Sequence, residues 1–364
     1  MRADVLLLSG EPVWPPHTGG RARLAGLAAA LAEEFRVGVL EVGGPDEDGT
    51  PWRRGIAADR LPGWRQPLSP RPRLGRSVLG PRAVAAVRGA VGESGARALV
   101  AGHSYLGAMV DVPRLVVDFA NVEAERYALL ARSAPPVWRA VHTLEAAKAR
   151  RWEPALARRA WLNVAVSDAD AATIRGWGGD VVTVPSGRPD WIRPVPSPAG
   201  GPALLVVNAT YAPNVTAARW LLDDVWPHVR HPRAALRVVG RGSDAIAASD
   251  PRVTVAGEVA DLGAEYAGSA FVVAPVGSGG GTQLKVAEAL AAGRAVVATS
   301  YSARSVPGAL GGACVVADEP AAFARAIDSL FEDRAGQERV ALATGLPSWA
   351  EVAAPLVERL RGVA

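Results

Sequence analysis

Short apolar runs alternate along this chain with stretches in which apolar residues recur every three or four positions. Runs of the first kind predict buried strands, and stretches of the second kind predict helices. Their regular alternation predicts right-handed βαβ units and parallel sheets that are buried on both faces. The predicted strands are residues 4–9, 36–42, 97–101, 114–118, 162–166, 180–184, 203–207, 235–239, 252–255, 270–274, 294–298 and 313–317, and the predicted helices include 19–34, 82–93, 136–159, 214–229, 282–292, 319–333 and 348–361.

One segment dense in proline and glycine, residues 185–202, interrupts this alternation. Such a segment fits neither a helix nor a central strand, so it predicts a linker between two α/β domains. The expected organisation is a first domain at 1–186, a linker at 187–201, a second domain at 202–347 and a final helix at 348–364.

Composition narrows the class of protein. A chain of 364 residues suits two domains, and a single cysteine, Cys314, excludes a disulfide framework. The five histidines are scattered, so we predict no metal site. The apolar run near the N-terminus is too short for a signal peptide, and no stretch reaches membrane-spanning length. With a net charge of only +4, nucleic-acid binding is not indicated, and we expect a soluble cytoplasmic protein.

The clearest chemistry lies in residues 278–293, Ser-Gly-Gly-Gly-Thr-Gln-Leu-Lys-Val-Ala-Glu-Ala-Leu-Ala-Ala-Gly. Apolar strands precede and follow this segment, so a glycine turn opens a helix between two buried strands. Free N–H groups at a helix start attract anions, and glycines let the backbone approach a ligand closely. Lys285 adds a positive charge one turn later, and Glu288 can accept hydrogen bonds from hydroxyls such as those of a ribose. The alternative is that Lys285 and Glu288 pair with each other on a solvated helix face.

In the first half, polar residues and glycines stand at the carboxyl ends of predicted strands, where open parallel sheets form their sites. They are Gly19 and Gly20 at the first helix start, His103, Asp118 and Asn121. The dinucleotide fingerprint G-x-G-x-x-G is absent at the first turn, which argues against NAD or FAD. The alternatives are tight packing for the glycines, a histidine satisfied by its loop, and a helix N-cap for Asp118.

These segments resemble family 4 glycosyltransferases, which have the GT-B fold. The family's usual signature is a pair of glutamates, of which the second falls on Glu288 and the first on Gly280, so the chain resembles a subgroup with the variant GGGT-x-LK. Three flanking segments match the family in order, and they are Pro213 to Val215, Leu236 to Gly242 and Val253 to Leu262.

The resemblance implies two Rossmann-like domains whose parallel sheets face each other across a cleft, with the C-terminal helix crossing back to the first domain. It also implies that a sugar moves from a nucleoside-diphosphate donor to a hydroxyl acceptor with retention, without a metal ion or a further cofactor. The residues so implied are His103, Lys285 and Asp118 in catalysis; Gly19, Gly20, Arg241, Val259, Gly280, Gly281, Thr282, Lys285 and Glu288 at the donor; and His17 and Asn121 at the acceptor.

Two points of the implied chemistry have alternatives. Many relatives hold the diphosphate with a cation pair after the first strand of the second domain, but residues 208–214 contain no cation. Diphosphate binding would then depend on Lys285, the backbone of residues 280–282 and Arg241, although Arg241 can instead pair with Asp244. The proton of the acceptor hydroxyl can pass to Asp118 or to the leaving diphosphate.

Residues 43–81 form a long, arginine-rich region that we expect to be irregular. Loops of this length are usually functional or mobile. One hypothesis is that Trp52 and Trp64 stack on a sugar ring of the acceptor; the other is that they close the edge of the domain. The arginines mildly favour an anionic or membrane-borne acceptor, and with it a peripheral membrane contact.

Two further functions fit the same fold. A nucleotide-sugar epimerase would consume the donor without an acceptor, and it needs additional acid–base carboxylates in the cleft. A non-catalytic partner protein would bind a nucleotide sugar tightly without turnover, which is compatible with the missing first glutamate. For the transferase, the candidate acceptors are natural products, glycolipids and polysaccharides, and we expect a monomer or a homodimer.

Overall fold

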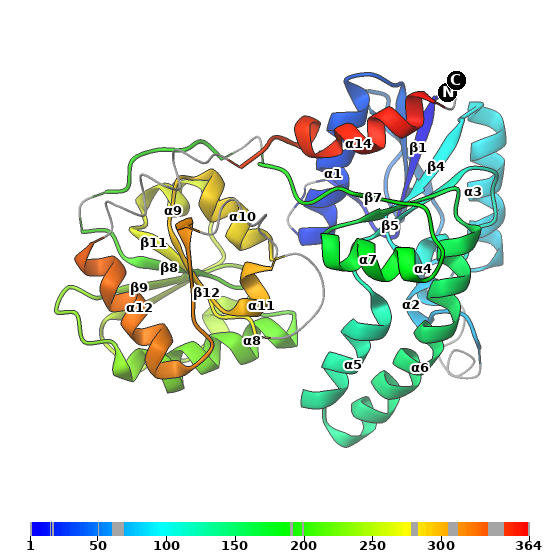
Figure 1. Ribbon diagram of the computed structural model, residues 1–364. Helices are drawn as coiled ribbons and strands as arrows, with labels where there is room; N and C mark the ends of the chain where they lie inside the picture. Colours follow the sequence, from blue (N-terminus) through cyan, green and yellow to red (C-terminus); the bar gives the residue numbers. More distant parts are fainter. Residues whose placement is uncertain are drawn as a thin grey trace. The chain divides into compact units, whose positions relative to one another are not determined.

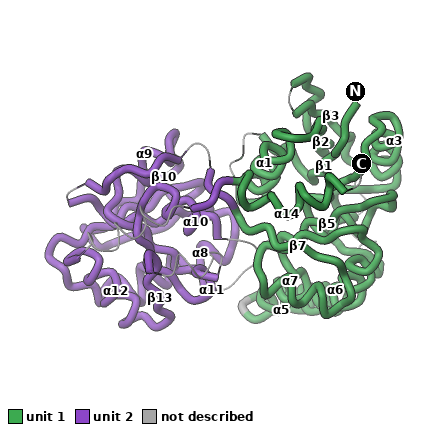
Figure 2. The backbone as a smooth tube through the Cα atoms, turned by 45° about the horizontal axis from the view of Figure 1, so that its top comes forward, with its two compact units in different colours: residues 1–186, 280–282, 349–364 green, residues 187–279, 283–348 purple. Residues whose placement is uncertain are grey.

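The structure is a computed structural model, and it describes residues 2–14, 16, 18–49, 51–59, 69–189, 192–198, 200–277, 283–304, 312–333 and 346–362. The chain forms two compact units, shown in Figure 2. Unit 1 comprises residues 1–186 with 349–364, and unit 2 comprises residues 187–279 with 283–348. Within the described part of the chain, no helix is long and apolar enough to cross a membrane.

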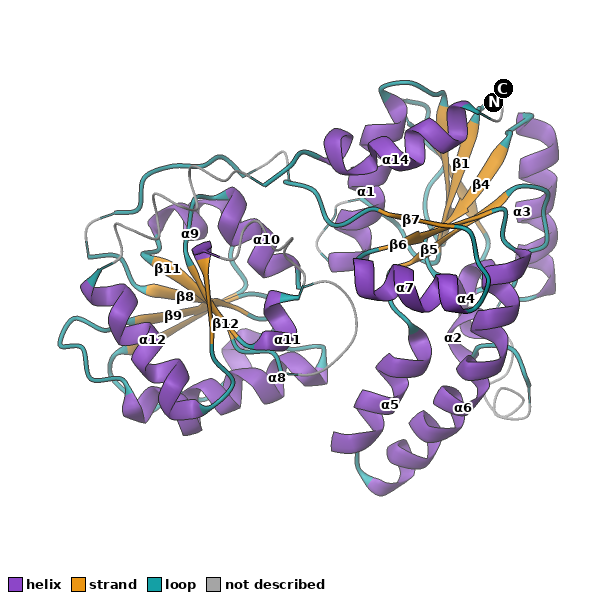
Figure 3. Cartoon of the chain, in the orientation of Figure 1, coloured by secondary structure: helices purple, strands orange, loops and turns teal. Residues whose placement is uncertain are grey.

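Unit 1 is built on a parallel sheet whose described strands have the order β3-β2-β1-β4-β5-β6-β7. Alternate side chains of β1 enter two separate cores, because Leu6 and Leu8 pack on one face of the sheet and Val5 and Leu7 on the other. Helices cover both faces (Figure 3). The strands are β1 (Val5–Ser9), β2 (Val37–Val42), β3 (Trp52–Ile56), β4 (Ala98–Ala101), β5 (Leu115–Phe119), β6 (Leu162–Ala165) and β7 (Val181–Thr183), and the helices are α1 (Gly19–Ala32), α2 (Arg73–Val78), α3 (Pro81–Ser94), α4 (Ser104–Gly107), α5 (Glu123–Ser133), α6 (Pro136–Arg159), α7 (Asp168–Gly176) and α14 (Trp349–Arg361).

Unit 2 is built on a second parallel sheet, with the order β10-β9-β8-β11-β12-β13 among its described strands. The predicted α/β class with two parallel sheets is thereby confirmed. The strands are β8 (Ala203–Val206), β9 (Leu236–Val239), β10 (Val253–Gly257), β11 (Phe271–Ala274), β12 (Val296–Ala298) and β13 (Cys314–Val316), and the helices are α8 (Ala212–Arg219), η2 (Trp220–Val225), η3 (Trp226–His228), η4 (Ser243–Ala245), α9 (Leu262–Gly268), α10 (Leu284–Ala291), α11 (Ser300–Ala303) and α12 (Pro320–Glu332).

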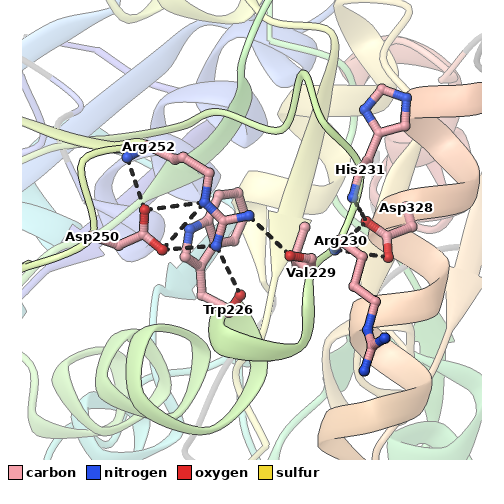
Figure 4. A network of polar contacts seen from close by, with 7 residues as sticks. All are labelled: Trp226, Val229, Arg230, His231, Asp250, Arg252 and Asp328. Carbon is pink, nitrogen blue, oxygen red and sulfur yellow. Dashed lines mark hydrogen bonds and ion pairs between the residues drawn. The ribbon is translucent and has the colours of Figure 1, made fainter.

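A polar network fixes the amino-terminal edge of this second sheet (Figure 4). Arg252, directly before β10, pairs with Asp250 at 2.7 Å and donates to the carbonyl oxygen of Val229 at 2.9 Å. Its guanidinium also lies over the ring of Trp226, 5.4 Å from the ring centroid. Asp328 of α12 accepts from two successive N–H groups of the same segment. The network lies away from the carboxyl ends of the strands, so its role is structural.

The expectation that residues 43–81 are irregular is wrong for β3 and α2. Trp52 is the first residue of β3 and pairs with Gly38 of β2, where a Cβ atom would lie only 2.3 Å from the Trp52 ring. The indole Nε1 donates to the carbonyl oxygen of Arg2 at 3.4 Å. Trp52 therefore packs at the amino-terminal edge of the sheet, a place that favours the edge-closing alternative over acceptor stacking. Trp64 lies outside the described residues.

The arginines of β3 are held by carboxylates of unit 1. Arg53 pairs with the buried Glu41 at 2.9 Å, and Arg54 pairs with Glu93 of α3 at 2.8 Å. These ion pairs largely neutralise the positive charges of Arg53 and Arg54. The two arginines therefore no longer argue for an anionic acceptor.

The chain returns to unit 1 in its last helix, α14, which packs on α1. Gly26 of α1 makes room for the ring of Trp349, because a Cβ atom at Gly26 would lie 2.1 Å from that ring. At the other end of the helix, Arg361 donates to Glu34 at 2.6 Å. A glycine and an ion pair therefore fix α14 on α1.

Candidate functional site

Lys285 lies in the first turn of α10, directly after the segment that follows β11. Its Nζ donates to Oδ1 of Asn214 at 3.4 Å, and Nδ2 of Asn214 donates to the carbonyl oxygen of Asn208 at 3.1 Å. Burial lowers the pKa of Lys285 to about 8, against the opposing charge of Glu288. Lys285 is half-buried, and this hydrogen bond holds its ammonium group toward the segment that follows β8 and not on a solvated helix face.

Glu288 lies one turn further along α10 and is anchored by a tyrosine. The hydroxyl of Tyr266, a fully buried residue of α9, donates to Oε2 of Glu288 at 2.7 Å. Burial raises the pKa of Glu288, while the Tyr266 hydrogen bond and the charge of Lys285 oppose that rise. The described part of the chain shows no hydrogen-bond donor to the other oxygen of Glu288, Oε1.

Two more strand ends meet at the same edge of the unit 2 sheet, because the strands are parallel. Arg241 follows β9, and its carbonyl oxygen accepts from the N–H of Ala209 at 2.9 Å, which ties the turn to the end of β8. Its side chain is exposed and, among the described contacts, forms no ion pair with Asp244. Val259, after β10, is half-buried against the core around Tyr266. Lys285, Glu288, Arg241 and Val259 thus share one edge.

The remaining donor residues predicted in this segment, Gly280, Gly281 and Thr282, lie outside the described residues, as does the acceptor candidate His17. The described start of the site is Gln283, the N-cap residue of α10.

A second group of predicted residues meets at the carboxyl edge of the unit 1 sheet. Thr18 caps α1, which begins at Gly19, and a Cβ atom at Gly20 would lie 3.3 Å from Nε2 of His103. Nδ1 of His103 and Oδ1 of Asn121 are buried and have no hydrogen-bond partner in the described part of the chain. Buried polar groups are usually paired, so these two atoms indicate a place for a polar ligand.

The surroundings of His103 favour the uncharged form of its imidazole. Burial lowers the pKa of its imidazole below the ordinary value, although Asp118 and Glu123 oppose the shift. The ring stacks on Tyr105 with 4.9 Å between centroids, which fixes its plane. Because Nδ1 lacks a partner, the alternative of a histidine satisfied by its own loop is not supported.

Asp118 has a structural partner that the sequence did not reveal. Both of its carboxylate oxygens accept from the guanidinium of Arg23 at 2.8 Å, and both side chains are almost fully buried. Arg23 also donates to the carbonyl oxygen of Val184 at 3.0 Å. The proposed N-cap role is wrong, since the N-cap of α5 is Val122. With both oxygens engaged, Asp118 is poorly placed to accept a proton.

Sequence reasoning missed three residues that position this chemistry, namely Asn214, Tyr266 and Arg23. Asn214 stands in the segment where a cation pair was sought and not found, so its position carried a signal. The positions of Tyr266 and Arg23 carried no such signal, because each residue contacts a partner that is remote in sequence.

Comparisons with known proteins identify a domain family and similar folds. Residues 201–333 match the family model described as Glycosyl transferases group 1, and no curated protein sequence matches the chain. Among solved structures, sucrose-phosphate synthase from Thermosynechococcus elongatus has a TM-score of 0.69 at 18% identity, over 99% of this chain and 98% of that one.

Two other solved structures have the same fold. HepE from Anabaena, in complex with UDP and glucose, has a TM-score of 0.65 at 16% identity, over 99% of this chain and 100% of that one. WaaG, a glycosyltransferase involved in lipopolysaccharide biosynthesis, has a TM-score of 0.58 at 15% identity, over 97% of this chain and 95% of that one. The fold of the chain is thus that of GT-B proteins. With its group 1 domain, the chain is a glycosyltransferase.

Proposed function

We propose that the chain transfers a sugar from a nucleoside-diphosphate donor to a hydroxyl acceptor with retention at the anomeric carbon. The observation that carries the proposal is the N-terminal half of α10, where Lys285 is directed to Asn214 and Glu288 to Tyr266. One helix turn thus offers a positioned cation and, three residues on, a positioned carboxylate. A diphosphate and the ribose hydroxyls next to it present the complementary charges and donors.

Support for the nucleotide comes from the site and from one relative. Anabaena HepE is seen with UDP and with UDP-glucose, which makes uridine diphosphate the first ligand to test. In this chain, Oε1 of Glu288 would accept from a ribose hydroxyl, while main-chain groups near Val259 would meet the base.

We propose that Lys285, and to a smaller extent the exposed Arg241, stabilises the negative charge that develops on the leaving diphosphate. We also propose that no metal is required. Positioned positive groups stabilise charge that develops in the transition state. The acceptor oxygen bonds to the anomeric carbon as the bond from that carbon to the β-phosphate oxygen breaks. The acceptor's proton passes to the departing phosphate oxygen, since Asp118 is held by Arg23.

At the carboxyl edge of unit 1, His103 and Asn121 would bind hydroxyl groups of a sugar or an acceptor through their unpartnered atoms. A neutral imidazole suits such polar contacts. We propose these two residues as the polar anchors of unit 1 and leave Trp52 out of the acceptor site.

Calorimetry with UDP, GDP and dTDP tests the proposal. Lys285→Ala should weaken binding of the preferred nucleotide by about 1.5–3 kcal/mol, the range for hydrogen bonds to charged groups. The matched control is Lys148→Ala, since Lys148 is the other lysine of the chain and lies on α6. Equal affinity of wild type and Lys285→Ala would remove Lys285 from the site. Donor consumption without an acceptor would instead favour an epimerase, and binding without any turnover a partner protein.

A further inference from the structure

The α5–α6 hairpin, whose two helices pack on each other, extends from the rest of unit 1 (Figure 1). Four large apolar side chains of the described chain are exposed, and three of them belong to α6. Val137 is 75% exposed, Trp138 49% and Leu144 44%. Single exposed apolar residues are ordinary, but a cluster on one helix marks an interaction surface.

The spacing of these residues makes them one surface. Val137 and Leu144 are seven positions apart, which is about two helical turns and places them on the same side of α6. Two exposed alanines, Ala140 and Ala147, continue the stripe at helical spacing. Trp138 lies beside it, with its ring stacked 6.0 Å from His142 and the guanidinium of Arg73 at 5.6 Å. A fixed tryptophan thus flanks an apolar stripe.

The charges around this stripe have one sign. Exposed arginines stand at positions 132, 139, 150, 151 and 158 of the hairpin. The two glutamates of α6, Glu145 and Glu153, are buried and turned into the unit. Of the acidic residues of α5, only Glu125 is exposed. The outer face of the hairpin therefore combines apolar contact area with a strong excess of positive charge.

We propose that this face, which we call the α6 face and define by Val137, Leu144, Arg151 and Arg158, docks on an anionic lipid surface. Apolar side chains enter the boundary between headgroups and acyl chains, while arginines attract the anionic headgroups. The charge argues against a second copy of this chain as the occupant, because two such faces would repel each other. The inference is independent of the donor chemistry proposed for unit 2.

Sedimentation with lipid vesicles tests the proposal. Wild type should bind phosphatidylcholine vesicles that contain phosphatidylglycerol, and bind vesicles of phosphatidylcholine alone much less. Arg151→Ser with Arg158→Ser should lower the partition coefficient on the anionic vesicles roughly thirtyfold. Val137→Ser with Leu144→Ser should lower it roughly tenfold.

Matched controls separate docking from general loss of charge or apolar surface. Arg88→Ser with Arg175→Ser removes two exposed arginines elsewhere in unit 1, and Val316→Ser removes the exposed apolar residue of unit 2. Neither should change the partition coefficient, and all variants should keep the thermal unfolding midpoint and UDP affinity of wild type. Vesicle binding that is equal in α6-face variants and wild type would overturn the proposal. So would a wild type that ignores vesicles but self-associates through this face in sedimentation velocity.

Discussion

The hydroxyl of Tyr266 donates to Glu288 across 2.7 Å and thereby joins a buried residue of α9 to α10. Removing the hydroxyl with Tyr266→Phe leaves the carboxylate free to turn. We expect affinity for UDP to fall by about 0.5–1.5 kcal/mol, the net value of one hydrogen bond. Calorimetry measures this, and Tyr127→Phe, a buried tyrosine of unit 1, is the control.

The same variant distinguishes positioning from a mere loss of stability. If Glu288 accepts from a ribose hydroxyl, the penalty of Tyr266→Phe should be smaller for 2′-deoxy-UDP than for UDP. A penalty of equal size for both ligands would contradict the assigned role of Glu288.

Lys285 should make nucleotide binding depend on pH. Burial lowers the pKa of its ammonium group to about 8, so the free protein loses this charge as the pH rises through that value. A diphosphate prefers the protonated form, and its affinity should therefore decline above pH 8. Titrations across this range measure the decline. In Lys285→Arg the cation persists at all these pH values, and the affinity should stay level; a decline of the same size there would assign the pH dependence to another group.

Most of the sheets follow from the sequence because their strands are continuous apolar runs. All five residues of β1 and all four of β11 are buried, and such runs leave a clear signal between helical stretches. β3 was not predicted because it is not a continuous apolar run. It contains two arginines, and the carboxylates that pair with them, Glu41 and Glu93, are brought close only by the fold.

The same contrast between local patterns and remote partners holds for the candidate site. Lys285 and Glu288 were predictable, since a glycine turn between two apolar strands is a local pattern. Their partners were not, because Asn214 precedes Lys285 by 71 positions and Tyr266 precedes Glu288 by 22. Asp118 was predicted at the correct edge, but its partner Arg23 was not, because Arg23 lies 95 positions earlier.

The pair of Arg23 and Asp118 should show in stability. Asp118→Ala leaves a buried guanidinium without its counter-charge and should lower the free energy of unfolding by about 3–5 kcal/mol. Urea denaturation measures the loss. The double variant Arg23→Met with Asp118→Leu removes both charges and should recover much of it. If Asp118→Ala is as stable as wild type, the ion pair has no structural role and a catalytic one returns to consideration.

Glu153 should give the stability of the protein a pH dependence of its own. This buried residue of α6 accepts from the N–H groups of Glu123 and Ala124 at 2.7 and 2.9 Å, so it serves as the missing N-terminal cap of α5. Burial raises its pKa from 4.5 to about 8, although both hydrogen bonds oppose the rise. Between these two pH values the folded state keeps the proton and the unfolded state has lost it. Because the unfolded state then binds fewer protons, the free energy of unfolding falls as the pH rises.

The variant Glu153→Gln isolates this effect. Its amide keeps an acceptor for one of the two N–H groups but cannot ionise, so the decline between pH 4.5 and about 8 should flatten relative to wild type. Urea denaturation at a series of pH values measures both curves. Glu145→Gln, a change at the other buried glutamate of α6, is the control and should keep the wild-type slope. Parallel curves for wild type and Glu153→Gln would mean that Glu153 is already ionised in the folded protein, held so by the two helix-start amides.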